Sequence, residues 1–364
     1  MRHPNRVDVE TALRSYQDPY LKQDLLSADC IKSIDLQDGK VRITVELSYP
    51  AKGLCSGIAQ LLTSKVEDIS GIKTVDVSVD WQVNSAPVQS QLDVMEGVKN
   101  IIAVASAKGG VGKSTTAANL ALALAKEGAR VGVLDADIYG PSMGLMFGIQ
   151  ENQRPDIQDN CFFVPIEAHG IQLMSMAFLV TEDTPIVWRG PMVSGALQQL
   201  LTQTAWDQLD YLIIDMPPGT GDIQLTLAQK VPVTGSVIVT TPQDLALIDA
   251  KKSIEMFHKV DIPVLGVIEN MAVHLCSQCG HMEQLFGENG GSRIAETYAT
   301  NLLGSLPLSI MIREQADAGK PTVAAEEDSQ ITMIYCDIAR QMTAQLSLKN
   351  KDKTVFPEIS MTTD

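Results

Sequence analysis

The sequence has no long hydrophobic run, few aromatic residues and no excess of basic side chains. No uninterrupted apolar run approaches the roughly 20 residues that a membrane helix requires, so we expect no membrane partner. The 28 lysines and arginines are outnumbered by 44 aspartates and glutamates, which gives a formal net charge of −16. Because phosphate backbones bind basic surfaces, this balance argues against a nucleic-acid partner. With 45% hydrophobic and 20% charged residues, the composition is typical of a globular enzyme.

Cysteine is also too sparse for a disulfide scaffold. Six cysteines in 364 residues indicate a reducing compartment. The N-terminal stretch MRHPNRVDVETALRSY lacks the apolar segment of a signal peptide, so we expect a cytoplasmic location. Four cysteines are scattered singly, and Cys276 and Cys279 lie close together. These two are therefore the candidates for metal chemistry.

Hydrophobic patterning divides the chain into two parts of different type. In the first part, KVRITVEL at 40–47 and KTVDVSVDW at 73–81 alternate apolar and polar residues as half-buried strands do. Helical spacing near 7–16 and 57–68 completes a small α/β domain. The predicted parts are a domain over residues 1–83, a polar linker over 84–97, a larger domain over 98–350 and a C-terminal tail over 351–364.

The larger part carries short apolar runs without polar alternation. These runs are IIAVAS, RVGVLD, YLIID, GSVIVTT and PVLGVIEN. Strands buried on both faces have this composition, so we expect an α/β fold with a doubly wound, mostly parallel sheet. Segments such as TTAANLALALAKEG, LQQLLTQTAW and DLALIDAKKSIEMFHK fit the covering helices. Ligands of such sheets bind at the carboxyl ends of the strands.

A glycine-rich turn, AKGGVGKSTT at 107–116, follows the first of these strands and opens a helix. It ends in the G-K-[ST] of the phosphate-loop pattern, although Ala107 stands where that pattern has its first glycine. Backbone N–H groups of such a turn surround phosphate oxygens, and the helix N-terminus favours their charge. Lys113 is expected to contact the β- and γ-phosphates, and the Ser114 hydroxyl to bind Mg²⁺. The predicted nucleotide-binding residues are Ala107, Lys108, Gly109, Gly110, Val111, Gly112, Lys113, Ser114, Thr115 and Asn270.

Lys108 adds a second lysine to the loop. The resulting sequence K-G-G-V-G-K-S-T resembles the MinD/ParA-like branch of P-loop ATPases. This resemblance implies that Lys108 reaches phosphates bound to the partner subunit of a homodimer. A lysine in that position would stabilise transition-state charge as an arginine finger does. Lys108 is therefore a predicted catalytic residue, together with Lys113, which is expected to contact the β- and γ-phosphates.

Three aspartates follow two of the predicted strands. Asp135 ends VGVLD, Asp137 lies two residues further on, and Asp215 ends YLIID. Asp215 has the usual position of a Walker B carboxylate, which holds Mg²⁺ through water. By resemblance, Asp137 positions or activates the attacking water as a third catalytic residue, and Asp135 supports the metal. The expected Mg²⁺ residues are therefore Ser114, Asp135 and Asp215.

The nucleotide base is expected nearer the C-terminus. Asn270, in VIENM, follows a strand, and its amide offers a donor and an acceptor for an adenine edge. The segment LPLSIMIREQADAGKP at 306–321 resembles the loop that closes over the base in this branch. The N-K-x-D signature of guanine recognition is absent from the sequence, so ATP is the expected nucleotide.

Cys276 and Cys279 form a C-x-x-C pair followed by Gly280, which lets the turn close around a metal. Two thiolates are half of a tetrahedral site or of an iron–sulfur ligand set, and the sequence has no second C-x-x-C. A two-fold axis would bring two such pairs together, which independently favours a homodimer. With His274 and His281 the pair could instead form a mononuclear zinc site, and a redox dithiol is a third alternative.

Across residues 97–345 the sequence resembles the Mrp-type ATPases, cytoplasmic carriers of iron–sulfur clusters. The matching stretches are GVKNIIAVASAKGGVGKSTTAANLALALA, VGVLDADIYGPSMG, VWRGPMVSGAL, DYLIIDMPPGTGD, VIENM and CSQCGH. Residues 5–82 are more loosely similar to the iron–sulfur-assembly domain that precedes the ATPase in many bacterial members. The resemblance implies a [4Fe–4S] cluster held between two subunits by Cys276 and Cys279 of each. Such a carrier takes the cluster from assembly donors and passes it to apo-proteins, gated by nucleotide binding or slow ATP hydrolysis.

Two other functions share part of this pattern. A MinD/ParA-like positioning ATPase typically has a basic surface or an amphipathic tail, whereas the last residues here, KNKDKTVFPEISMTTD, lack apolar periodicity. A zinc-stabilised metallochaperone ATPase would use the same loop and the same two cysteines. Trp188 and Arg189, in VWRGPM, are candidates for the dimer interface or for a structural role.

Overall fold

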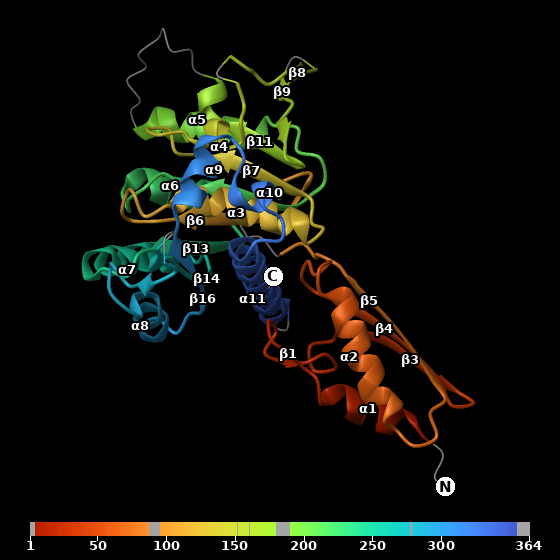
Figure 1. Ribbon diagram of the computed structural model, residues 1–364. Coiled ribbons are helices and arrows are strands. Elements are labelled where there is room, and N and C mark those ends of the chain that lie inside the picture. The colour runs from red at the N-terminus through yellow and green to blue at the C-terminus, as the bar shows by residue number, and fades with distance from the viewer. Residues whose placement is uncertain are drawn as a thin grey trace, which may run out of the picture. The chain divides into compact units, whose positions relative to one another are not determined.

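The computed structural model describes residues 4–86, 95–150, 152–159, 161–179, 190–276 and 279–354. Contacts divide the chain into two compact units (Figure 1): one comprises Met1–Asn84, Lys126–Gly128 and Thr343–Asp364, and the other comprises Ser85–Ala125 and Ala129–Met342. Most of the predicted linker, the predicted tail from residue 355 onward, Trp188 and Arg189 lie outside the described residues. The domain bounds taken from the sequence therefore stay a prediction.

The smaller unit is a three-stranded sheet with two helices. β3 (Ile31–Gln37) runs antiparallel to β4 (Lys40–Leu47), which runs parallel to β5 (Thr74–Trp81). Alternate residues of β4 are buried because successive side chains of a strand point to opposite faces, and they share one core with α1 (Arg6–Arg14) and α2 (Cys55–Glu67). The strands predicted at 40–47 and 73–81 are confirmed. Two short strands, β1 (Gln17–Asp18) and β2 (Gln23–Asp24), pair with each other.

The larger unit is built on one central sheet with the strand order β10–β11–β7–β12–β6–β13–β14, and β16 pairs with β14. The pairs from β11 to β16 are parallel, and β10 and β15 add antiparallel pairs. This arrangement confirms the doubly wound, mostly parallel sheet. The strands are β6 (Val98–Ala105), β7 (Val131–Asp135), β10 (Ile166–Ala168), β11 (Ile171–Ser175), β12 (Leu209–Asp215), β13 (Gly235–Thr240), β14 (Val264–Leu275), β15 (Met282–Glu283) and β16 (Leu302–Leu308).

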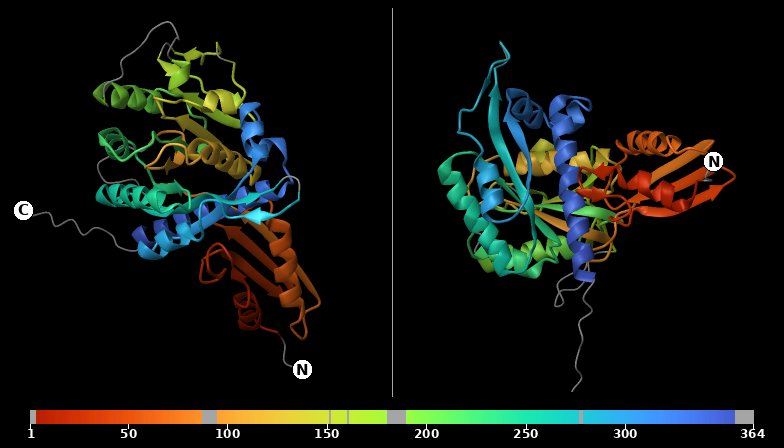
Figure 2. Two further views of the ribbon diagram at one scale, coloured as in Figure 1. Left: turned by 60° about the vertical axis from the view of Figure 1, so that its left-hand side comes forward. Right: turned by 90° about the horizontal axis from the view of Figure 1, so that it is seen from below.

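Helices cover both faces of this sheet. α3 (Lys113–Lys126) lies on one face, and α5 (Gly190–Thr202), α6 (Asp222–Lys230) and α7 (Asp244–Lys259) lie side by side on the other (Figures 1 and 2). This division follows from the right-handedness of the crossover connections. The connection from β6 to β7 through α3 runs toward one edge strand, whereas the connections through α5, α6 and α7 run toward the other, so α3 lies on the opposite face. The remaining elements are α4 (Met143–Met146), β8 (Ile157–Gln158), β9 (Phe162–Phe163), the 3₁₀ helix η1 (Met176–Phe178), α8 (Gly290–Thr297), α9 (Ile310–Asp317), α10 (Thr322–Ala325) and α11 (Gln330–Thr354). None of the helices in the described part of the chain is long and apolar enough to cross a membrane.

Candidate functional site

The glycine-rich turn connects the carboxyl end of β6 to the N-terminus of α3, as the sequence predicts. Gly110 and Gly112 have φ angles of +80° and +82°, in the left-handed region that glycine adopts without a steric penalty. Ala107, in contrast, is not among the residues with positive φ. The alanine therefore introduces no backbone strain at the position where the general pattern has a glycine.

Lys113 is the centre of the charged groups behind this loop. Its Nζ lies 2.5 Å from Asp215 Oδ1 and 3.7 Å from Asp137 Oδ2, and it donates a hydrogen bond to Ser114 Oγ at 3.1 Å. The Lys113 side chain is 6% exposed and that of Asp215 is 0% exposed. Buried charges are stable when they are paired, so Lys113 compensates the Asp215 carboxylate. The structure thus brings together four residues that the sequence assigns to phosphate, metal and catalysis.

Asp135 lies on the strand next to Asp215, directly opposite it in the register. It accepts hydrogen bonds from the backbone N–H groups of Ser142 at 3.0 Å and Met143 at 3.1 Å, and from Ser175 Oγ at 3.1 Å. Burial, followed by the nearby charge of Asp215, raises the pKa of Asp135 to about 7, and burial also raises the pKa of Asp215. Carboxyl groups buried this close together favour a bound cation. Neither Ser175 nor Ser142 was predicted from the sequence. Ser175 belongs to no motif, and Ser142 lies in VGVLDADIYGPSMG, a stretch in which only the aspartates were assigned a role.

The residues fit a magnesium ion. Asp215 Oδ2 is buried without a hydrogen-bond partner, as is Ser142 Oγ. An unpaired buried carboxylate oxygen is costly, and a divalent cation would supply the missing interaction. Mg²⁺ prefers oxygen ligands, and Ser114 of the loop, with Asp135 and Asp215 at the ends of β7 and β12, would supply them. When bound there, Mg²⁺ would neutralise charge on the nucleotide phosphates.

Lys108 differs from Lys113 in burial and in side-chain partners. Its side chain is exposed, and within the described residues it makes no hydrogen bond or ion pair. Lys113 is buried and paired inside its own subunit. The two lysines of the loop therefore have different surroundings: Lys113 is buried, whereas Lys108 is exposed to solvent.

Asn270 lies against the phosphate loop. Its Nδ2 donates to the Val111 carbonyl at 2.8 Å, and its Oδ1 accepts from the Met271 backbone N–H at 2.9 Å. A Cβ added at Gly112 would lie 2.2 Å from Asn270 Nδ2, so the amide packs directly on the loop backbone. Asn270 therefore lies next to the phosphate loop. Its role in binding the adenine base stays a prediction.

Cys276 and Cys279 lie in the turn between β14 and β15. These strands pair antiparallel, with Leu275 opposite Met282, and the hairpin (cyan) extends away from the sheet in the right-hand view of Figure 2. The Cys276 N–H donates to the His281 carbonyl at 2.9 Å, and the Gly280 N–H donates to the Cys276 carbonyl at 2.9 Å. Cys276 is half-buried and Cys279 is exposed, and both are thiols. The two cysteines therefore lie at the end of the hairpin, one half-buried and the other exposed.

The described residues of one chain do not by themselves form a complete metal site at the cysteine pair. Among the described residues there is no group of three or more His, Cys, Asp or Glu side chains that could hold a metal ion. His274 and His281 are thus not brought together with the two thiols into the zinc site that the spacing allows. Cys276 and Cys279 would supply two of the four ligands that a tetrahedral metal site or a [4Fe–4S] cluster requires.

Several exposed apolar residues lie at or after the carboxyl ends of the parallel strands. They are Tyr139, Leu245, Ile248, Leu275, Met282, Ile310 and Met311. A cavity of about 270 Å³ lies beside the hairpin and is lined mainly by apolar residues, among them Val273, Pro307 and Ile334. Apolar surface of this kind marks an interaction site more often than scattered exposed residues do.

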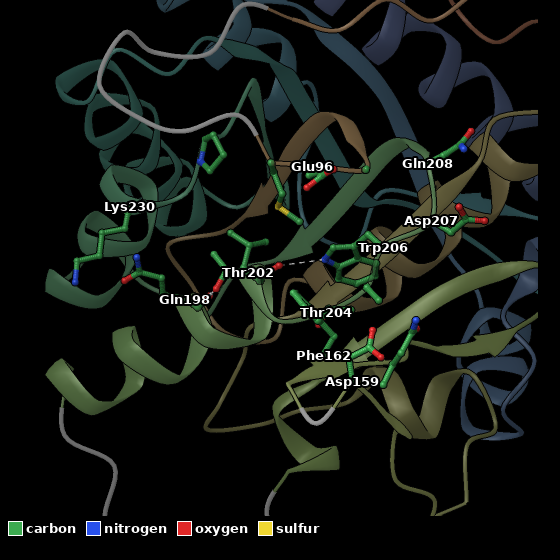
Figure 3. Close-up of a pocket in the computed structure, with 16 residues that line it drawn as sticks. Glu96, Asp159, Phe162, Gln198, Thr202, Thr204, Trp206, Asp207, Gln208 and Lys230 are labelled. Atoms are coloured by element: carbon green, nitrogen blue, oxygen red, sulfur yellow. Dashed lines mark hydrogen bonds between the residues drawn. The ribbon is translucent and has the colours of Figure 1, made fainter.

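A larger cavity of about 730 Å³ lies at the amino ends of the strands, opposite the phosphate loop (Figure 3). Glu96 and Gly97 precede β6, and Asp207 and Gln208 precede β12, so the cavity is at the amino ends of the strands. Trp206 forms part of its wall and donates from Nε1 to the Leu201 carbonyl at 3.3 Å. Nucleotides bind at the carboxyl ends of the strands in such sheets, so this cavity is separate from the phosphate loop.

The parallel sheet, the phosphate loop and the adjoining carboxylates define a P-loop ATPase of the MinD/ParA class. The MinD cell division ATPase of Pyrococcus furiosus shares this fold, with a TM-score of 0.50 and 20% identity over 66% of this chain and 97% of that one. A nucleotide-binding protein of Archaeoglobus fulgidus, solved in complex with ADP, has a TM-score of 0.56 and 38% identity and covers 64% of this chain and 90% of that one.

The chain belongs to the family described as NUBPL iron-transfer P-loop NTPase, whose model matches residues 97–343. Residues 6–79 match a second family, described as iron–sulfur cluster assembly protein. An iron–sulfur cluster carrier protein of Pseudomonas fragi is 65% identical over 279 residues, covering 77% of this chain and 97% of that protein. The iron–sulfur cluster carrier protein of Escherichia coli K12 is 49% identical over 341 residues, covering 94% of this chain and 92% of that protein.

Proposed function

We propose that the protein is a homodimeric, ATP-binding carrier of iron–sulfur clusters. Its cargo is a [4Fe–4S] cluster held between two subunits by Cys276 and Cys279 of each, and transferred from assembly donors to apo-proteins. Slow Mg²⁺-dependent hydrolysis of ATP accompanies the transfer. The cytoplasm is the proposed location, as expected from the sequence.

The observation that carries the proposal is the incomplete thiol pair at the end of the hairpin. Among the described residues no third ligand joins Cys276 and Cys279, whereas a [4Fe–4S] cluster takes four thiolates. A two-fold axis supplies the other two, because it places the same turn of a second chain opposite the first. The names of the relatives from Pseudomonas fragi and Escherichia coli support the cluster as cargo.

Two further features support a second subunit that would bind at the carboxyl ends of the strands. Lys108 is an exposed residue of the loop and could reach phosphates across an interface. The exposed apolar residues lie at or after the carboxyl ends of parallel strands, on the side of the sheet that carries the loop and the hairpin. A second copy of the chain would cover both the lysine and the apolar surface.

Anaerobic reconstitution tests the assigned ligands. The double variant Cys276→Ala/Cys279→Ala should lose bound iron and acid-labile sulfide, because the ligand set loses all four thiolates of the dimer. Cys161→Ala is the matched control, since Cys161 is another exposed thiol and is expected to leave cluster content unchanged. Undiminished cluster in the double variant would show that the site is elsewhere. One zinc per chain without sulfide would instead favour the metallochaperone.

A further inference from the structure

One strand, β14, connects the phosphate loop to the thiol pair. It touches the loop at Asn270 and ends at Leu275, directly before Cys276. At about 3.3 Å per residue, at most roughly 20 Å of chain separates Asn270 from Cys276. A change in the loop therefore has a short covalent path to the turn that holds the cysteines.

The contact at the loop end of this path is close. Asn270 Nδ2 donates to the Val111 carbonyl at 2.8 Å, and a Cβ at Gly112 would lie 2.2 Å from the same nitrogen atom and 3.9 Å from Met271 Cε. Both side chains thus rest on the part of the backbone whose N–H groups surround phosphate oxygens in a phosphate loop. Any rearrangement of Val111 and Gly112 around a phosphate must move or release Asn270.

β14 is irregular at this point. Glu269 pairs with Ser305 and the next pair joins Val273 to Pro307, so β14 advances four residues while β16 advances two. The additional residues form a bulge, and Met271 within it has a φ of +57°. The left-handed region disfavours residues that carry a Cβ, and such strain concentrates at switching and binding sites. Bulges also redirect side chains, which accounts for Asn270 pointing at the loop.

The strand is fixed on both sides of the bulge. Before it, the buried Glu269 accepts hydrogen bonds from the Gly291 N–H at 2.8 Å and from Ser305 Oγ at 3.3 Å. After it, regular pairing resumes at Val273 and continues into the hairpin with β15. A change in the bulge would therefore alter the direction of the hairpin as a unit.

We propose that Asn270 and Met271 are positioning residues that couple the nucleotide in the phosphate loop to the position of the C-x-x-C hairpin. The inference deepens the proposed function, since it names the element through which nucleotide gates the cluster. Occupation of the loop shifts Val111, the Asn270 amide changes its contact, and the strained bulge transmits the change to Cys276. Linkage makes the effect reciprocal, so a filled thiol site changes nucleotide affinity by the same factor.

Hydrogen–deuterium exchange of the full-length, metal-free protein tests this coupling. Saturating ADP should change the exchange rate of amides in Met271–Leu275 and at Cys276 by roughly fivefold or more, the usual lower range of coupling between sites. Asn270→Ala, compared at its own saturating ADP concentration, should lose this response. Lys113→Ala is the control for nucleotide binding, because its hairpin should not respond at any concentration.

Two variants of Met271 separate strain from side-chain packing. Met271→Ala and Met271→Gly both remove the side chain, but the glycine alone relieves the positive φ. We expect the hairpin response to persist in Met271→Ala and to fall in Met271→Gly. If Asn270→Ala does not fold, Asn270→Asp keeps the acceptor for the Met271 N–H and removes the donor to Val111.

An unaltered exchange response in Asn270→Ala or Asn270→Asp would overturn the coupling, as would a wild-type hairpin that does not respond to ADP. Because this experiment uses no cluster, its outcome is independent of the reconstitution test. If the hairpin responds to ADP but the reconstituted protein binds no cluster, the proposed cargo is wrong and the coupling still holds.

Discussion

At the scale of residues, the phosphate loop shows how three glycines in one turn have different roles. Gly109 has neither a positive φ nor a heavy atom within 4 Å of an added Cβ, whereas Gly110 has a φ of +80° and open space. Gly112 combines a φ of +82° with a Cβ position 2.2 Å from Asn270. Sequence pattern alone treats these glycines as equivalent members of a motif.

Alanine substitutions at the three glycines should therefore form a graded series. Gly112→Ala should lower the free energy of unfolding by about 1–3 kcal/mol and weaken nucleotide binding, because it adds backbone strain and displaces Asn270. Gly110→Ala should cost about 1 kcal/mol through strain alone, and Gly109→Ala less than about 0.5 kcal/mol. Chemical denaturation and nucleotide titration measure both quantities. A Gly109→Ala variant as unstable as Gly112→Ala would contradict this geometry.

At the scale of elements, the sequence predicted what depends on uninterrupted apolar runs and missed what depends on tertiary pairing. The strands that became β6, β7, β12 and β13 were predicted because burial on both faces leaves a continuous apolar signal. β16 was missed, since LLGSLPL contains a glycine and a proline and is held in place by its parallel pairing with β14.

The candidate site divides in the same way. The loop, the three aspartates and the cysteine pair follow motif spacing and were all predicted. The extension of β14 beyond Asn270 and the bulge at Met271 were missed, because they arise from pairing with β16 and from contact with Val111. A local pattern carries no signal for such long-range contacts.

The C-terminal end of α5 also differs from the prediction. The periodicity of LQQLLTQTAW predicted a helix to residue 206, but α5 ends at Thr202. Trp206 instead packs against the end of the helix: the residue is 6% exposed, and its Nε1–H donates to the Leu201 carbonyl. Helical spacing cannot distinguish an apolar residue on a helix from one that packs against the helix end.

Substitution of Trp206 measures how much this packing stabilises the larger unit. Trp206→Ala should lower the free energy of unfolding by about 3–5 kcal/mol, because it removes a buried aromatic side chain. Trp206→Phe keeps a ring but loses the hydrogen bond to Leu201, and should cost about 1–2 kcal/mol. Denaturant unfolding of both variants gives the values. Equal losses for the two would mean that the hydrogen bond, and not the ring, stabilises this region.

At the scale of the whole molecule, the two loop lysines should act on different sites of the proposed dimer. Lys113→Ala should abolish nucleotide binding and also reduce stability, since it leaves the buried Asp215 without its cation. Lys108→Ala should leave the stability of the subunit unchanged but lower ATP hydrolysis by a factor on the order of 10³, as loss of a transition-state cation does. Nucleotide titration and phosphate release measure these effects.

Mixing the two variants tests whether Lys108 crosses between subunits. A mixed dimer contains one site with an intact Lys113 in its own chain and an intact Lys108 from the partner. Equal mixing of two inactive variants should therefore restore about a quarter of the wild-type rate, since half of the dimers carry one working site. A mixture that stays inactive while the chains exchange would show that Lys108 does not act in trans.

The central proposal is that the thiol site is complete in a pair of chains and incomplete in one. Native mass spectrometry of the anaerobically reconstituted protein tests it most directly, because the measured mass gives chains, iron and sulfide together. We expect a species with two chains and a single [4Fe–4S] cluster, and its replacement by single chains when the cluster is removed by oxidation. A single chain that retains a complete cluster, or one zinc ion bound to each chain, would contradict the proposal.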